Sequence, residues 1–122
     1  MQIIHQLMQE SDSLVVATLI YFAGVSDQTK LWFDRMFPYI GMNLSPKLPG
    51  PNKGSFIFMQ NQPDARLFET PITPFMQMVE LPDLSMKDYL VAYELDLGVK
   101  PPVTDNLEFM DRAYRMGRDL RN

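Results

Sequence analysis

Apolar residues along this chain gather in short continuous runs and in stripes at helical spacing. The longest run, residues 14–22, contains a single residue, Thr18, that is neither aliphatic nor aromatic. A run of this length that is rich in Val and Ile is typical of a strand buried on both faces of a parallel sheet. A buried helix is the alternative, but Gly24 and Ser26 follow too soon for one. We therefore predict a fully covered strand over about residues 13–21.

Two later segments read as further strands. Residues 55–60 (SFIFMQ) are nearly all apolar and end in the polar turn 60–64. Residues 87–95 (KDYLVAYEL) are more mixed, because Tyr89, Val91 and Tyr93 alternate with residues that include Asp88. Such a mixture suits a strand nearer the edge of a sheet. The sequence thus predicts about three strands.

Four helices are expected around these strands. Residues 1–10 carry apolar positions at helical spacing, and His5 falls on the polar side of that helix, where we expect it to be solvated. Ser26 is a good N-cap for a helix that runs to about Met36, with Pro38 ending it. The helix is expected to bury its apolar side chains, namely Leu31, Trp32 and Met36.

The last two helices follow the second and third strands. A helix within residues 65–81 contains Pro71 and Pro74, so it either begins at Pro74 or has a broken first turn, and we favour the broken turn. Asp105 and Glu108 form a capping box for the final helix. Its expected apolar stripe consists of Leu107, Met110, Ala113, Tyr114, Gly117 and Leu120.

Helices and strands thus alternate along the whole chain, with residues 41–53 as a long loop. Alternation of this kind predicts an α/β fold with a parallel sheet and right-handed connections. We find no repeat, no low-complexity segment and no boundary, so residues 1–122 form one domain.

Composition removes several classes of function. The chain has no cysteine and one histidine, which excludes disulfides and thiol catalysis and disfavours a zinc site. A formal net charge of −4 gives no support to nucleic-acid binding. No apolar stretch is long enough to span a membrane, and no signal peptide precedes the first strand. We therefore expect a cytoplasmic protein that acts on neither nucleic acid nor membrane.

Ligands of open α/β sheets bind beyond the carboxyl ends of the strands. Residues 21–26 and 60–62 occupy such positions here. Tyr21 and Phe22 either stack on a planar ligand or complete a buried strand, and Ser26 either contacts a ligand or simply caps its helix. The amides of residues 60–62 suit a polar ligand edge, although turn formation explains them equally well. No carboxylate pair or histidine is brought together by spacing, so no catalytic residue or metal ligand is predicted.

The first of these segments resembles the NAD(P)H-dependent FMN reductase family, whose fold is flavodoxin-like. Six residues match the family's pattern at its spacing: Thr18, Tyr21, Ser26, Lys30, Asp34 and Arg35. Residues 60–64 (QNQPD) are similar to the family's second flavin-side loop, and the last helix is similar to its last helix. The resemblance implies a three-layer flavodoxin-like domain that binds FMN through Thr18, Leu19, Ile20, Tyr21, Phe22, Gly24, Ser26, Gln60, Asn61 and Gln62.

The resemblance covers only the C-terminal part of the family's domain. Family members begin with a strand and a phosphate-binding loop, and no comparable Gly/Ser-rich stretch precedes Ser13. Two departures occur at the flavin side: Leu19 replaces a proline, and Asn61-Gln62 replace a turn that contains glycine. Since backbone amides of the missing loop would hold the phosphate, tight FMN binding is in doubt.

The expected function is therefore an oxidoreductase reaction, hydride transfer from NAD(P)H to FMN and then to an acceptor. The alternative is a non-catalytic remnant that forms oligomers and does not hold FMN tightly. The choice between NADH and NADPH, and the acceptor, stay open. Because the family's first strand would lie beside residues 13–21, we expect the edge of this strand to be open. It should pair with another copy in a homo-oligomer, or with a polypeptide that supplies the missing strands.

Overall fold

The computed structural model describes residues 2–44, 48–95 and 100–122. Its helices and strands alternate as predicted. The helices are α1 (Gln2–Gln9), α2 (Asp27–Asp34), α3 (Glu69–Val79) and α4 (Leu107–Arg121). The strands are β1 (Leu14–Tyr21), β2 (Gly24–Val25), β3 (Lys53–Met59) and β4 (Ser85–Ala92). Short 3₁₀ turns lie at Phe37–Tyr39, Met42–Leu44 and Val103–Asp105.

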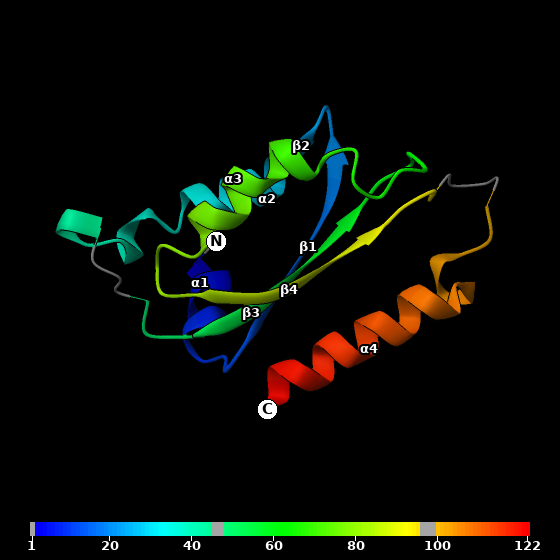
Figure 1. The fold of residues 1–122 in the computed structure, drawn as a ribbon. Coiled ribbons are helices and arrows are strands. Elements are labelled where there is room, and N and C mark those ends of the chain that lie inside the picture. Colours follow the sequence, from blue (N-terminus) through cyan, green and yellow to red (C-terminus); the bar gives the residue numbers. More distant parts are fainter. Residues whose placement is uncertain (1, 45–47, 96–99) are drawn as a thin grey trace.

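The sheet has the strand order β2-β1-β3-β4. β1, β3 and β4 are parallel, and the two-residue β2 pairs antiparallel with the end of β1. Helices α2 and α3 lie on one side of the sheet and α4 on the other, which gives three layers (Figure 1). The α/β class, the parallel sheet and the edge position of β4 are confirmed, whereas the hairpin that contains β2 was not predicted.

The main core lies between the sheet and helices α2 and α3. Its centre is the pair Phe56 and Phe58, whose rings stack with centroids 5.3 Å apart and which are almost completely buried. Four further buried residues surround them: Val16, Ile72, Val79 and Leu84. A smaller cluster under α4 joins Leu90 and Ala92 of β4 to Phe109 and Met116. The sheet is therefore anchored on both faces, mainly through β3 and β4.

The prediction that β1 is buried on both faces is wrong. Val16 and Thr18 are buried, but Val15, Leu19 and Tyr21 are 48%, 43% and 56% exposed. Alternate residues of a strand point to opposite faces, so one face of β1 is covered and the other is not. The reason is the position of α4, which packs on β3 and β4 and leaves β1 bare. An apolar run along the sequence cannot show this difference.

Helix α2 begins as predicted and ends early. The Ser26 hydroxyl accepts a hydrogen bond from the backbone N–H of Thr29 at 3.3 Å, which confirms the N-cap. The helix stops at Asp34, and Pro38 lies inside the following 3₁₀ turn rather than ending α2. Met36 is buried and Trp32 is partly buried against the core, as expected, whereas Leu31 is exposed.

Two other helix starts differ from the prediction. Helix α3 begins at Glu69 and continues through Pro74, with the Thr73 hydroxyl donating to the carbonyl of Glu69 at 2.6 Å. Pro71 lies in the first turn, where no N–H is needed. Helix α4 is capped by Asn106, whose Oδ1 accepts from Phe109 N at 3.1 Å, while Asp105 belongs to the preceding 3₁₀ turn.

The buried stripe of α4 is also rotated from the predicted one. Phe109, Met116 and Leu120 are buried, whereas Leu107, Met110 and Tyr114 are exposed. Of the predicted stripe, Leu120 is buried and Ala113 packs against the cluster under α4. Both sets recur at helical spacing, and hydrophobicity alone favours neither. The contact with β4 selects the first set, and the second becomes an apolar flank that faces solvent.

Helix α1 contacts the rest of the molecule through few side chains. Met8 is buried and accepts a hydrogen bond on its sulfur from Trp32 Nε1 at 3.3 Å, while Ile3, Ile4 and Leu7 are exposed. The prediction that His5 is solvated is wrong. Its Nδ1 lies 3.0 Å from the Tyr39 hydroxyl, and the two rings stack. The compact turn Phe37–Tyr39 places Tyr39 there, which sequence spacing did not indicate.

We expect the variant Gly50→Ala to lose stability. A Cβ at Gly50 would overlap the carbonyl oxygen of Met8 and lie 2.6 Å from the Cα of Gln9, both backbone atoms of the α1 end. The backbone must move, so the free energy of unfolding should fall by about 1–3 kcal/mol in urea titrations. Gly117→Ala is the control, since nothing lies within 4 Å of its Cβ and helical Ala is favoured by roughly 0.5–1 kcal/mol. Equal stability of the two variants would contradict this account.

Candidate functional site

A cleft of about 870 Å³ opens beyond the carboxyl ends of β1, β3 and β4. This size is within the range of small-molecule sites, and its position is the one expected for open α/β sheets. Most of its wall is apolar, with three amide side chains and one cation. It is lined by Leu19, Ile20, Tyr21, Phe22, Met59, Gln60, Asn61, Gln62, Phe68, Leu95, Lys100, Pro101, Pro102 and Val103.

Seven of the ten residues predicted to bind a cofactor line this cleft: Leu19, Ile20, Tyr21, Phe22, Gln60, Asn61 and Gln62. The structure therefore brings together the ends of β1 and β3, which are separated by some forty residues of sequence. Parallel pairing of the two strands, with Leu19 opposite Met59, is what aligns these ends.

Thr18, Gly24 and Ser26 do not line the cleft. The Thr18 hydroxyl accepts a hydrogen bond from the backbone N–H of Ser26 at 3.2 Å and lies 3.3 Å from the Ser26 hydroxyl. Thr18 is buried beneath the start of α2, where it ties β1 to the helix cap. Gly24 pairs with Tyr21 across the hairpin. These three residues stabilise the connection between β1 and α2.

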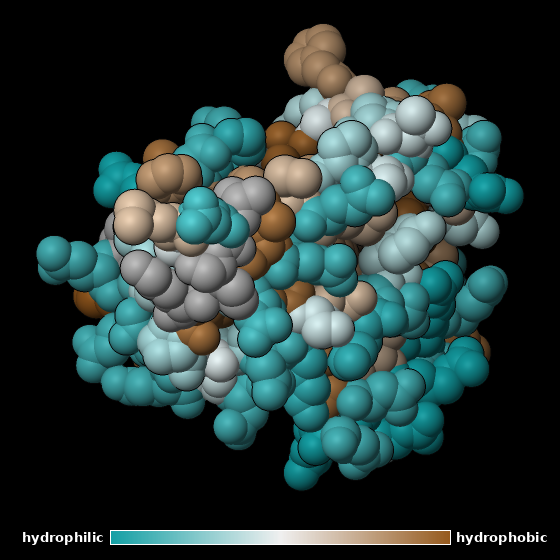
Figure 2. Space-filling view, turned by 60° about the vertical axis from the view of Figure 1, so that its left-hand side comes forward, coloured by the Kyte–Doolittle hydropathy of each residue, from teal (hydrophilic) through white to brown (hydrophobic). Residues whose placement is uncertain are grey.

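The turn between β1 and β2 has an unusual backbone. Phe22 and Ala23 have φ values of 48° and 63°, and they are the two central residues of a two-residue hairpin. This is the geometry of a type I′ turn, which normally contains Asn or Gly, so a bulky Phe there is strained. The Phe22 ring is fully exposed at the cleft mouth. In Figure 2, an apolar side chain stands clear of the surface at the end of the molecule where this hairpin lies.

Gln60 shapes the opposite wall. It is 4% exposed, and its Nε2 donates to the carbonyls of Asp64 at 2.7 Å and Gln62 at 3.3 Å. Its backbone N–H donates to Ala92 O, and Glu94 N donates to Gln62 O at 3.2 Å. The loop at residues 60–64 is therefore held in one shape by its own glutamine and by the end of β4.

The Gln60 amide oxygen has no hydrogen-bond partner among the described residues, although it is buried. Its orientation is determined by the two carbonyls, because only the NH₂ group can donate to them. A buried acceptor without a donor costs roughly 1–3 kcal/mol. A ligand N–H group that reached this oxygen would remove that cost.

The third wall of the cleft was not predicted from the sequence. Lys100, Pro101, Pro102 and Val103 follow β4, and Met59, Phe68 and Leu95 complete the apolar lining. The signal was present, since this segment follows the strand predicted at residues 87–95, and the same rule about carboxyl ends applies to it. Lys100 is the single charged side chain among the described lining residues.

Arg66 lies just before α3 and does not line the cleft. A hydrogen bond to Glu69 raises the pKa of the exposed Arg66 guanidinium, so this side chain remains cationic.

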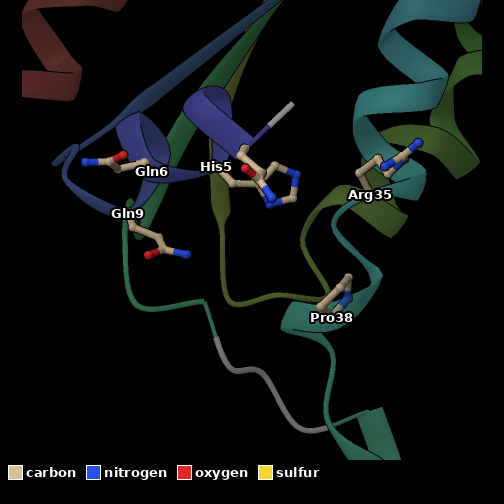
Figure 3. A pocket seen from close by; sticks show the side chains of 6 residues that line it. His5, Gln6, Gln9, Arg35 and Pro38 are labelled. Atoms are coloured by element: carbon tan, nitrogen blue, oxygen red, sulfur yellow. The ribbon is translucent and has the colours of Figure 1, made fainter.

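A second, shallower groove of about 390 Å³ lies between α1 and the end of α2. Helix α1 lines one side of this groove with Gln2, His5, Gln6 and Gln9, and the opposite side is lined by Arg35 and Pro38. In Figure 3 the Arg35 guanidinium points away from His5, and Gln6 points away from both. The polar groups do not converge on one point, so this groove is a weaker site than the cleft.

The described residues contain no group of three or more His, Cys, Asp or Glu side chains that is able to hold a metal ion. No helix in the described ranges is both long and apolar enough to cross a membrane.

No protein-family model matches this sequence, and no curated protein matches it. Among solved structures, the fold is similar to that of a Trp repressor binding protein from Bacillus subtilis, with a TM-score of 0.69 and 20% sequence identity. The match covers 94% of this chain and 68% of that chain. This likeness confirms the flavodoxin-like fold of the chain, and at such low identity it shows the fold alone.

Proposed function

We propose that this chain binds a flavin in the cleft at the carboxyl ends of β1, β3 and β4, as a relative of the NAD(P)H-dependent FMN reductases. The observation that carries the proposal is the pairing of a large apolar cleft with the unpartnered buried oxygen of Gln60. A flavin ring system has a flat apolar body and a pyrimidine edge that carries an N–H donor. The flavodoxin-like fold supports the same class of ligand.

The residues that line the cleft suit the two parts of such a ring system. Tyr21, Phe22 and Pro102 provide apolar or aromatic surfaces against which a planar ring can stack. Gln60, Asn61 and Gln62 provide amide groups for its polar edge, and the Gln60 oxygen is oriented in advance as an acceptor. When bound, a flavin would supply hydride transfer between a nicotinamide and an acceptor, while the protein supplies position and electrostatics.

The phosphate of FMN has little to bind to in this cleft. The described lining contains no glycine-rich loop with converging backbone N–H groups, and Lys100 is the one cation within it. We therefore propose that affinity comes from the ring system, with NAD(P)H as the reductant. A second candidate, a non-catalytic protein that binds flavin weakly and transfers no hydride, is favoured by the same missing phosphate loop.

Titration with FMN and with riboflavin tests the proposal. If the cleft holds the ring alone, the fluorescence of both flavins should be quenched on binding. Their dissociation constants should lie in roughly the micromolar range and within about threefold of each other. Flavin fluorescence and co-elution in gel filtration measure this, and Tyr39→Phe, which removes the hydroxyl that contacts His5 and Gln9 of α1, should bind unchanged. Absence of binding by either flavin at about 100 μM would overturn the proposal. NADPH oxidation by the loaded protein then separates the reductase from the non-catalytic candidate.

A further inference from the structure

The outer edge of β4 presents backbone groups that do not bond to β3. Among the described strands, β4 pairs with β3 alone. The N–H of Gln60, which follows β3, donates to the carbonyl of Ala92, so the Ala92 carbonyl points towards β3. Successive residues of a strand direct their backbone groups to opposite sides. Tyr89 and Val91 therefore direct theirs outwards, away from β3.

Both outward groups of Tyr89 are occupied by charged side chains. Arg112 of α4 donates from Nη2 to the Tyr89 carbonyl oxygen at 2.7 Å. The N–H of Tyr89 donates to Oδ1 of Asp88 at 2.7 Å. The two side chains also form an ion pair, with 3.7 Å between Arg112 Nη2 and Asp88 Oδ1. A strand added at this edge needs the Tyr89 groups, so it would have to displace Arg112.

The first part of the same edge is protected from the other face of the sheet. Glu80, at the end of α3, accepts a hydrogen bond on Oε1 from the N–H of Met86 at 3.1 Å. The register with β3 shifts between Met86 and Asp88, which leaves Lys87 as a bulged residue. Charged side chains and bulges are the devices by which natural edge strands avoid association. Because α3 and α4 lie on opposite sides of the sheet, the edge is protected from both layers (Figure 1).

The segment that follows these residues explains why the edge needs protection. Residues 89–93 (YLVAY) contain no charge, no proline and no glycine, and three of the five are aromatic or β-branched. Such segments stack readily as β-strands when their edge is exposed. Charged residues flank the segment, with Asp88 before it and Glu94 after it. The side chains of Tyr89 and Val91 pack against the main core, so the backbone edge is the part that another strand can reach.

We propose that Arg112 guards the β4 edge: its guanidinium occupies the Tyr89 carbonyl and so prevents further copies of this chain from adding strands at residues 89–93. Asp88 holds the guanidinium at the edge and occupies the neighbouring N–H. Neither residue lines the cleft, so the inference does not depend on flavin binding.

Arg112→Met tests the proposal, because it removes the guanidinium and keeps an apolar stem of similar length. Arg115→Met is the matched control. Arg115 lies on the same helix with similar exposure, and it pairs at 2.7 Å with Asp111 of that helix. Each variant removes one positive charge from a chain of formal net charge −4, so repulsion between copies increases equally in both.

Thioflavin T fluorescence and light scattering follow the growth of stacked strands. The assay is performed at a temperature where circular dichroism shows every variant to be folded. Arg112→Met should aggregate at least about tenfold faster than the unmodified chain, whereas Arg115→Met should stay within about twofold of it. Equal rates for the two arginine variants would overturn the proposal.

Gly50→Ala separates an open edge from a loss of stability. This variant disturbs the end of α1, leaves β4 unchanged, and is expected to have a lower urea midpoint than Arg112→Met. If the edge controls aggregation, Arg112→Met should aggregate faster although it is the more stable of the two. Faster aggregation of Gly50→Ala would show that unfolding is the cause, and the guard role of Arg112 would be rejected.

Discussion

Replacing Gln60 by leucine is expected to weaken flavin binding about 10- to 100-fold, which corresponds to roughly 1.4–2.8 kcal/mol. The substitution removes the two hydrogen bonds that hold the carbonyls of Gln62 and Asp64, and it removes the buried acceptor that faces no protein donor. The loop at 60–64 loses its fixed shape, and the ligand loses a hydrogen bond. Flavin fluorescence titration of the purified variant measures the change.

Leucine has nearly the volume of glutamine, so the core should survive this change. Both affected carbonyls belong to exposed residues that water can reach, and the free energy of unfolding should fall by only about 1 kcal/mol. Gln77→Leu, on the exposed face of α3, is the matched control and should bind flavin like the unmodified chain. An unchanged dissociation constant for Gln60→Leu, with the variant folded, would show that the wall at residues 60–64 does not contact the ligand.

Phe58→Ala is expected to have the largest effect on stability, a loss of about 3–5 kcal/mol in the free energy of unfolding. Phe58 is completely buried, stacks on Phe56 and makes an edge contact with Tyr89, so its removal leaves a cavity at the centre of the main core. Domains of this size are stable by only about 5–15 kcal/mol, so much of the variant should unfold under mild conditions. Urea titration followed by circular dichroism measures the loss.

The matched control is a second phenylalanine outside the core. Phe37 is 74% exposed in the 3₁₀ turn Phe37–Tyr39, and Phe37→Ala should change stability by no more than about 0.5 kcal/mol. If both variants lost the same stability, the core would not be centred on β3 as described.

Much of the candidate site was predictable because it follows from strand direction. Once residues 14–21 and 53–59 are parallel strands, their carboxyl ends meet at one edge, and the residues that follow them line a common cleft. The part at residues 100–103 followed from the same rule and was missed. The strained turn at Phe22 was not predictable, because sequence statistics place Asn or Gly in such turns. Neither was the unpartnered oxygen of Gln60, which depends on where two carbonyls lie.

The sequence by itself determined the order of helices and strands, the parallel sheet and the Ser26 cap. These depend on local patterns, namely apolar runs, helical spacing and the chemistry of a helix start. Only the tertiary structure decided which face of β1 is bare and which stripe of α4 is buried. Both faces of β1 and both stripes of α4 are apolar, so hydrophobicity leaves the choice open. The packing of α4 against β4 makes that choice, since one helix covers about two strands and leaves the third exposed.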